Sequence, residues 1–203
     1  MNLDDKTIVF LGSSVTYGSA ADGYSMCDYV KEKTGVNVKK WALNGTTLAD
    51  INENSYVNRL KNNIDSQKKC DLFICQLSTN DASHNISLGE ISSSEMEECF
   101  DITTVSGAIE YIISRVKNKW NCPLAFYTGT YFDNHNYAEM VNLLLKLQKK
   151  WEFDIINLWD DEQMRSINQN LYEKYMNDPV HPTKSGYVEW WGPKFLDYIN
   201  KTL

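Results

Sequence analysis

The chain has 203 residues, of which 42% are hydrophobic and 23% charged, and it carries a formal net charge of −7. This length suits one domain, spanning residues 1–203, with a sizeable core. The composition excludes bulk disorder, and an acidic surface argues against nucleic acid as a partner because it repels phosphate groups.

The start of the chain carries no recognisable targeting signal. Residues 1–6 lead into only a short apolar run, whereas a secretory signal needs a basic start and a longer apolar stretch. No apolar run approaches the ~20 residues of a membrane helix. We therefore expect a cytoplasmic protein without a membrane partner.

The five cysteines are odd in number and show no Cys-x-x-Cys spacing, a pattern typical of reduced thiols. Only three histidines are present and none lies near a cysteine pair, so the sequence favours no metal site. Free cysteines are usually small buried hydrophobic residues, which makes a catalytic cysteine the weaker alternative. The residues concerned are Cys27, Cys70, Cys75, Cys99 and Cys122.

Apolar runs alternate with helical patterns along the chain. Short apolar runs predict buried strands at residues 8–11, 72–77 and 124–127, with weaker candidates at 36–41 and 153–158. Apolar residues at helical spacing predict helices at 22–34, 56–64, 105–120, 137–147 and 183–200. In the last of these, Gly192-Pro193 should bend or split the helix.

This alternation implies parallel strands joined by helical crossovers, and hence a three-layer α/β/α sandwich. The polar stretch 82–104 shows no clear periodicity. Loops of that length in a compact domain are often lids or binding loops, although a surface excursion without a functional role explains the stretch equally well.

Two motifs suggest nucleophilic catalysis. Gly-Ser-Ser at residues 12–14 directly follows the first strand, and Asp-Pro-Val-His-Pro at 178–182 precedes the last helix. A serine becomes a good nucleophile when a histidine, oriented by a carboxylate, takes its proton. Asp178 and His181 are three residues apart in a proline-braced loop and could supply that pair for Ser14. Each motif alone also fits a turn or a helix cap.

Two more polar motifs follow strands of the predicted sheet. Asn80 lies directly after the third strand, where its amide can donate a hydrogen bond to an oxyanion. Gly45 lies after the second strand, where it could offer a backbone N–H without an obstructing side chain. Taken alone, each motif also fits an ordinary turn.

The joint order of these motifs resembles the GDSL, or SGNH, hydrolase family, which is named for four such residues. The resemblance implies that Ser14 is the nucleophile, His181 the base and Asp178 the residue that orients it. It also implies an oxyanion hole made by the backbone N–H groups of Ser14 and Gly45 and by the Asn80 amide. The family fold is an α/β/α sandwich with a parallel, roughly five-stranded, flavodoxin-like sheet, and the chemistry needs no metal or organic cofactor.

The resemblance extends over residues 10–186, with two departures. Ser13 stands where the family usually has an aspartate, and Ser78 where it usually has a glycine. Because a serine has narrower backbone freedom than a glycine, the loop at Ser78 could be displaced. Neither residue has a named catalytic role.

The expected function is hydrolysis of a small, soluble, short-chain acyl ester through an acyl-enzyme, with an O-acetylated carbohydrate as one candidate substrate. Tyr131 and Phe132 are the better aromatic candidates to line the site, whereas the pair Trp190-Trp191 more often indicates core packing. Three alternatives stay open: acyl transfer to an alcohol, a non-catalytic carbohydrate-binding protein, and a phosphate-binding flavodoxin-like domain. The last of these leaves the Asp178/His181 pair unexplained.

Overall fold

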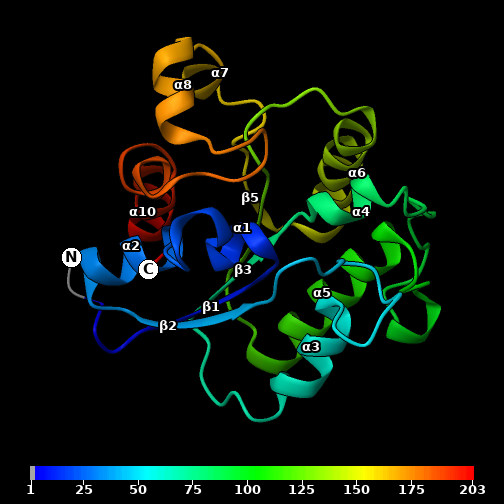
Figure 1. Ribbon diagram of the computed structural model, residues 1–203. Helices are drawn as coiled ribbons and strands as arrows, with labels where there is room; N and C mark the ends of the chain where they lie inside the picture. Colours follow the sequence, from blue (N-terminus) through cyan, green and yellow to red (C-terminus); the bar gives the residue numbers. More distant parts are fainter. Residues whose placement is uncertain (1–2) are drawn as a thin grey trace.

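The computed structural model describes residues 3–203, which form an α/β/α sandwich around one parallel sheet (Figure 1). The strand order is β2-β1-β3-β4-β5, which is the flavodoxin-like order, so the predicted fold is confirmed. The strands are β1 (Thr7–Gly12), β2 (Asn37–Ala42), β3 (Leu72–Gln76), β4 (Leu124–Tyr127) and β5 (Asp154–Ile156).

Helices cover both faces of the sheet (Figure 1). One face packs against α2 (Met26–Thr34) and α10 (Gly192–Thr202), and the other against α3 (Tyr56–Ile64), α5 (Val105–Trp120) and α6 (His135–Trp151). Strand β1 is buried throughout because both its faces are covered. Its side chains alternate, so that Val9 enters one core cluster and Phe10 the other.

The predicted helices agree with the observed ones, with α2 beginning later than expected. Asp22 and Gly23 have positive φ angles, and Ser25 caps the helix with the reciprocal hydrogen bonds of a capping box. Short elements that the periodicity did not show are α1 (Ser14–Tyr17), η1 (Ser19–Ala21), α4 (Thr79–Ser83), η2 (Glu97–Cys99), α7 (Glu162–Arg165) and α8 (Gln169–Tyr175).

The last helical segment is continuous and contains a π-helical turn directly before Gly192-Pro193, where the sequence predicts a bend or a split. The segment consists of α9 (Lys184–Gly186), a π-helical turn η3 (Tyr187–Trp191) and then α10. Pro193 lies in the first turn of α10, where a missing N–H costs little. A Cβ on Gly192 would lie 2.5 Å from the ring of Tyr29, so a glycine there lets α10 pack closely on α2.

The polar stretch 82–104 packs on the helices beside it. Backbone bonds join Val105 to Ser87 and Ser106 to Leu88, at 3.0 and 2.8 Å. The fully buried carboxylate of Glu110 on α5 accepts from the backbone N–H of Ser92 at 2.9 Å. These hydrogen bonds hold the stretch against α5.

Within residues 3–203, no helix has both the length and the apolar character that crossing a bilayer requires.

Candidate active site

The turn between β1 and α1 presents Ser14 at the carboxyl edge of the sheet. Gly12 is needed there, because a Cβ at that position would lie 1.8 Å from Oγ1 of Thr16. The side-chain oxygen of Gln76 accepts from the Ser13 N–H at 2.9 Å and from the Thr16 hydroxyl at 2.8 Å. These hydrogen bonds from β3 fix the conformation of the turn, and Ser14 is the first residue of α1.

Three of the sequence-predicted residues form one hydrogen-bonded chain. Oγ of Ser14 lies 2.8 Å from Nε2 of His181, and Nδ1 of His181 lies 2.8 Å from Oδ2 of Asp178. The side chain of His181 is 27% exposed, which gives solvent access to the ring. With a proton on Nδ1, Nε2 is free to accept the hydroxyl proton of Ser14.

The carboxylate of Asp178 also bonds its own loop. Its Oδ1 accepts from the backbone N–H groups of Val180 and His181, at 2.8 and 2.9 Å. Partial burial raises the pKa of Asp178, but these two amides and the His181 ring outweigh it and hold the pKa below its usual value. Asp178 therefore stays ionised and can stabilise a positive charge on the ring.

Candidate oxyanion donors come from three strand ends. Gly45 has a φ of +74°, and a Cβ built on it would meet nothing within 4 Å, so the glycine faces open space. Within residues 3–203, no acceptor bonds the backbone N–H of Gly45 or that of Ser14. The amide of Asn80 donates one hydrogen to the carbonyl of Thr46 at 2.9 Å, which leaves its second hydrogen available.

The sequence matches the model of a known protein family over most of its length. The model of the GDSL-like Lipase/Acylhydrolase family matches residues 10–188. The chain belongs to this family. No curated protein is similar enough to the sequence to count as a match.

Solved structures share the GDSL-like fold at low sequence identity. A protein from Lactobacillus plantarum is 15% identical, with a TM-score of 0.81 over 100% of this chain and 99% of that one. A possible lipase from Chitinophaga pinensis is 16% identical, with a TM-score of 0.68 over 96% and 98% of the two chains. An acetyl xylan esterase, AlAXEase, is 16% identical, with a TM-score of 0.69 over 95% and 99%. At these identities the likeness shows the fold.

The two departures from the usual GDSL-like motifs have different structural settings. Ser78 has a φ of −72°, which any residue adopts, and its hydroxyl caps α4 by accepting from the Asp81 N–H. The loop therefore does not require a glycine at this position. The hydroxyl of Ser13, by contrast, is fully buried and interacts with the buried hydroxyl of Tyr56.

Asp81 holds the loop that carries Gly45 in this GDSL-like chain. Its fully buried carboxylate accepts from the backbone N–H groups of Leu48 and Ala49, at 2.7 and 2.9 Å. Burial raises the pKa of Asp81, and these amides oppose the rise. No local pattern in the sequence indicated this role, although Asp81 directly follows Asn80.

Arg59 on α3 ties two strand ends together. Its guanidinium donates to the carbonyl of Gly12 at 2.8 Å and to that of Trp41 at 2.6 Å, and it also reaches the hydroxyl of Thr46 at 3.1 Å. Burial lowers the pKa of Arg59. No sequence signal pointed to this residue, because its acceptors are mostly backbone carbonyls.

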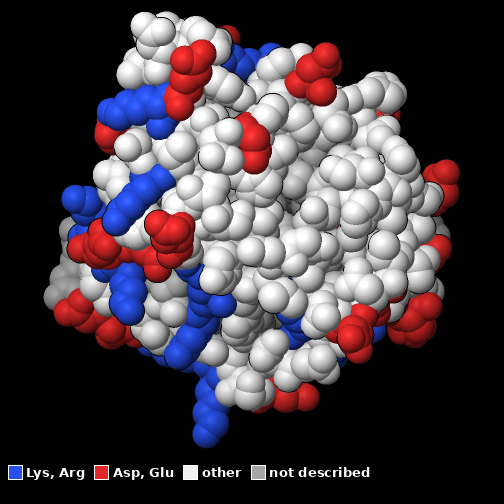
Figure 2. Space-filling view, viewed as in Figure 1, with Lys and Arg blue, Asp and Glu red and all other residues white. Residues whose placement is uncertain are grey.

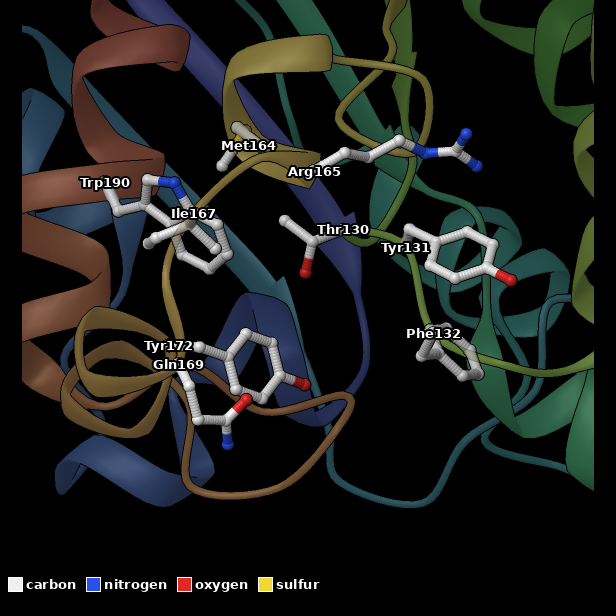
Figure 3. Close-up of a pocket in the computed structure, with 9 residues that line it drawn as sticks. All are labelled: Thr130, Tyr131, Phe132, Met164, Arg165, Ile167, Gln169, Tyr172 and Trp190. Atoms are coloured by element: carbon white, nitrogen blue, oxygen red, sulfur yellow. The ribbon is translucent and has the colours of Figure 1, made fainter.

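The aromatic candidates divide between core and site. Tyr131, Phe132 and Trp190 line a cavity of about 710 Å³ at this edge of the sheet (Figure 3). Trp191 is fully buried in the core. The two neighbouring tryptophans thus have different roles, and only the second has the core position expected of the pair.

Proposed function

We propose that this protein is a serine ester hydrolase that cleaves short-chain acyl esters through an acyl-enzyme formed on Ser14. The observation that carries the proposal is the chain of 2.8 Å contacts from Ser14 through His181 to Asp178. Membership of the GDSL-like Lipase/Acylhydrolase family supports the reaction class.

In the first half-reaction, Nε2 of His181 takes the hydroxyl proton while Oγ of Ser14 attacks the ester carbonyl. The imidazolium that forms is stabilised by the ionised carboxylate of Asp178. The carbonyl oxygen becomes an oxyanion, for which Ser14 N–H, Gly45 N–H and the Asn80 amide are the proposed donors. Collapse of this intermediate breaks the ester bond, and His181 returns its proton to the leaving alcohol.

In the second half-reaction, water replaces the alcohol. His181 takes a proton from the water as its oxygen attacks the acyl carbonyl, and the same oxyanion donors hold the second intermediate. Oγ of Ser14 then leaves and recovers the proton from His181. The exposure of the His181 side chain supports access for this water.

A small cavity beside the nucleophile supports a short acyl group. It has a volume of about 10 Å³ and is lined in part by Val15, Thr79 and Val180, the chain neighbours of Ser14, Asn80 and His181. Such a volume accommodates one water-sized group. The methyl of an acetyl group is of that size, so we propose an acetyl ester, with O-acetylated carbohydrates as the substrate class.

Two alternatives use the same surface. Acyl transfer to an alcohol would proceed through the same acyl-enzyme and is distinguished by product analysis with a competing alcohol. A non-catalytic carbohydrate-binding protein would have no need of the Ser14–His181–Asp178 geometry, and burst release from an activated ester would exclude it.

The test is hydrolysis of 4-nitrophenyl acetate by the wild type and by Ser14→Ala. We expect kcat to fall by roughly 10⁴-fold or more, as for other serine nucleophiles. Ser13→Ala is a matched control, since it removes a neighbouring hydroxyl while keeping the backbone N–H that bonds Gln76, and it should keep most of the activity. Equal rates for the wild type and Ser14→Ala would refute the proposal.

A further inference from the structure

The cavity of about 710 Å³ has the size of a small-molecule site. Its walls come from the loop after β4, from α7, from α8 and from η3 (Figure 3). It therefore collects side chains from four separate segments at the edge of the sheet that carries Ser14.

The hydroxyl of Thr130 lies unsatisfied in this cavity. Thr130 is only 4% exposed, and its Oγ1 has no hydrogen-bond partner within residues 3–203. Figure 3 shows the hydroxyl directed into the space between the surrounding side chains. Because buried hydroxyls are nearly always bonded, this one is suited to a polar group of a ligand.

Aromatic side chains surround that hydroxyl. Tyr131 is 49% exposed, yet its ring is held by Trp159, with ring centroids 4.9 Å apart. Trp190 stacks on Tyr175 at 5.7 Å, and Tyr172 faces the cavity from α8. Exposed but fixed aromatic rings provide flat apolar surfaces at little cost in side-chain entropy.

Arg165 adds hydrogen-bond donors at the rim. Its Nε donates to the carbonyl of Trp159 at 2.8 Å, and its guanidinium lies 4.4 Å from the centre of the Tyr131 ring. Asp160 lies 3.8 Å from the guanidinium and partly balances its charge. The middle of the face shown in Figure 2 carries few charged side chains. Apart from Arg165, the residues that line the cavity are uncharged, which favours an uncharged ligand.

The cavity is close to the reacting groups. Phe132 lines both this cavity and the small one beside Val15 and Val180. Burial raises the pKa of the Tyr172 phenol, and the negative charge of the nearby Asp178 carboxylate raises it further. A ligand in the larger cavity can therefore extend to an ester at Ser14.

We propose that this cavity binds the alcohol part of the substrate, a neutral carbohydrate, by stacking a sugar ring on Tyr131, Tyr172 or Trp190 and bonding a sugar hydroxyl to Thr130. The inference rests on the proposed ester hydrolysis. A sugar ring has an apolar C–H face and a polar rim, and this cavity offers flat apolar walls together with a free hydroxyl and a guanidinium.

The experiment compares two acetyl esters that differ in the alcohol: 4-nitrophenyl acetate and acetylated xylotriose. In Thr130→Val, which removes only the hydroxyl, kcat/KM for the acetylated xylotriose should fall about 10-fold through KM, the usual effect of losing one good hydrogen bond. Tyr131→Ala should have a similar effect. The rate with 4-nitrophenyl acetate should change less than about two-fold, because its leaving group has no sugar hydroxyl for Thr130 to bond.

Thr202→Val, near the end of α10, is the matched control and should alter neither rate. Equal losses on both esters, or no loss on either, would overturn the carbohydrate site while leaving ester hydrolysis intact. If the wild type hydrolyses neither ester, the proposed function fails instead. Titration calorimetry of xylotriose into Ser14→Ala and into Ser14→Ala/Thr130→Val then decides the site separately: weaker binding by the double variant supports it, and equal binding or none refutes it.

Discussion

The side-chain amide of Asn80 donates to the carbonyl of Thr46 at 2.9 Å, and Thr46 directly follows Gly45. This bond links two of the proposed oxyanion donors and fixes the plane of the amide, since the carboxamide group is flat. The direction of the second amide hydrogen is thereby fixed as well, so the amide does not have to rotate when an oxyanion forms.

Asn80→Ala should therefore lower kcat with 4-nitrophenyl acetate by about 10²–10³-fold, with a small change in KM. The measurement is steady-state kinetics of the folded variant. Asn62→Ala, on the outer surface of α3, serves as the control and should keep its activity. An unchanged kcat in Asn80→Ala would show that Asn80 does not stabilise the oxyanion.

Asp178 should stay ionised throughout the pH range of the assay. The pKa of Asp178 is lowered in the folded protein, so its ionised form stabilises the fold above its unfolded value of about 3.9. That contribution is lost only as pH falls through the lower, folded value. Proton uptake by Asp178 should therefore add nothing to the loss of kcat/KM at pH 5 and above.

The corresponding measurement is log kcat/KM against pH from 9 down to about 5, where the acid limb should have a slope of one. Asp178→Asn should reduce the rate by about 10⁴-fold by disfavouring the useful tautomer of His181. A limb with a slope of two in this range would indicate that Asp178 also takes up a proton.

Arg59 should act on catalysis through the position of the Gly12 and Trp41 backbones. Arg59→Lys keeps the charge but cannot donate to the carbonyls of Gly12 and Trp41 in the same fork geometry. We expect kcat to fall about 10-fold while KM changes little, measured at a temperature where circular dichroism shows a folded protein. Lys61→Ala on the same helix is the control, and a loss confined to thermal stability would contradict a positioning role.

Acyl length should control the rate because the cavity beside Ser14 measures about 10 Å³. With 4-nitrophenyl esters, kcat/KM should fall by at least about 10-fold from acetate to hexanoate, since a packed wall resists additional methylenes. Val180→Ala removes two methyl groups from this wall while keeping the backbone N–H that bonds Asp178, so it should raise the butyrate-to-acetate ratio. A flat acyl-length profile would disprove the size limit.

Two glycines at the site should respond differently to alanine. Gly12→Ala forces a Cβ to within 1.8 Å of Thr16, so it should destabilise the fold by about 1–3 kcal/mol. Gly45→Ala meets no atom within 4 Å and should cost only the ~1–2 kcal/mol of a left-handed φ. Thermal unfolding tests stability. Because alanine keeps the backbone N–H, any loss of activity in Gly45→Ala beyond its loss of stability would come from the Cβ that it places in the open space beside this residue.

The sequence predicted the elements that have strong local patterns. The continuous apolar runs of β1 and β3 arise because both faces of these strands are buried, and α5 shows the spacing of a helix with one buried face. The ends of β1 and β3, together with that of the weaker candidate β2, then place Ser14, Asn80 and Gly45 at one edge. That part of the site follows from topology alone.

The rest depends on contacts between segments that no local pattern records. Arg59 donates to backbone carbonyls, which every residue has, so its partners leave no mark in the sequence. Helix α7 has only four residues, too few for periodicity to show. Trp190 and Trp191 both lie in a π-helical turn, where neighbouring residues point in different directions and only Trp191 is buried in the core. The extra residue of that turn, which shifts the helical register, is invisible in the sequence.

The nucleophile and its base are 167 residues apart in the sequence. A chain emerging from the ribosome would expose the Ser14 turn well before the Asp178–His181 loop. A fragment that includes Asn80 but stops before Asp178 would carry the nucleophile and all three proposed oxyanion donors but no base. Under the proposed mechanism, the cell would acquire this activity only after the Asp178–His181 loop has been synthesised.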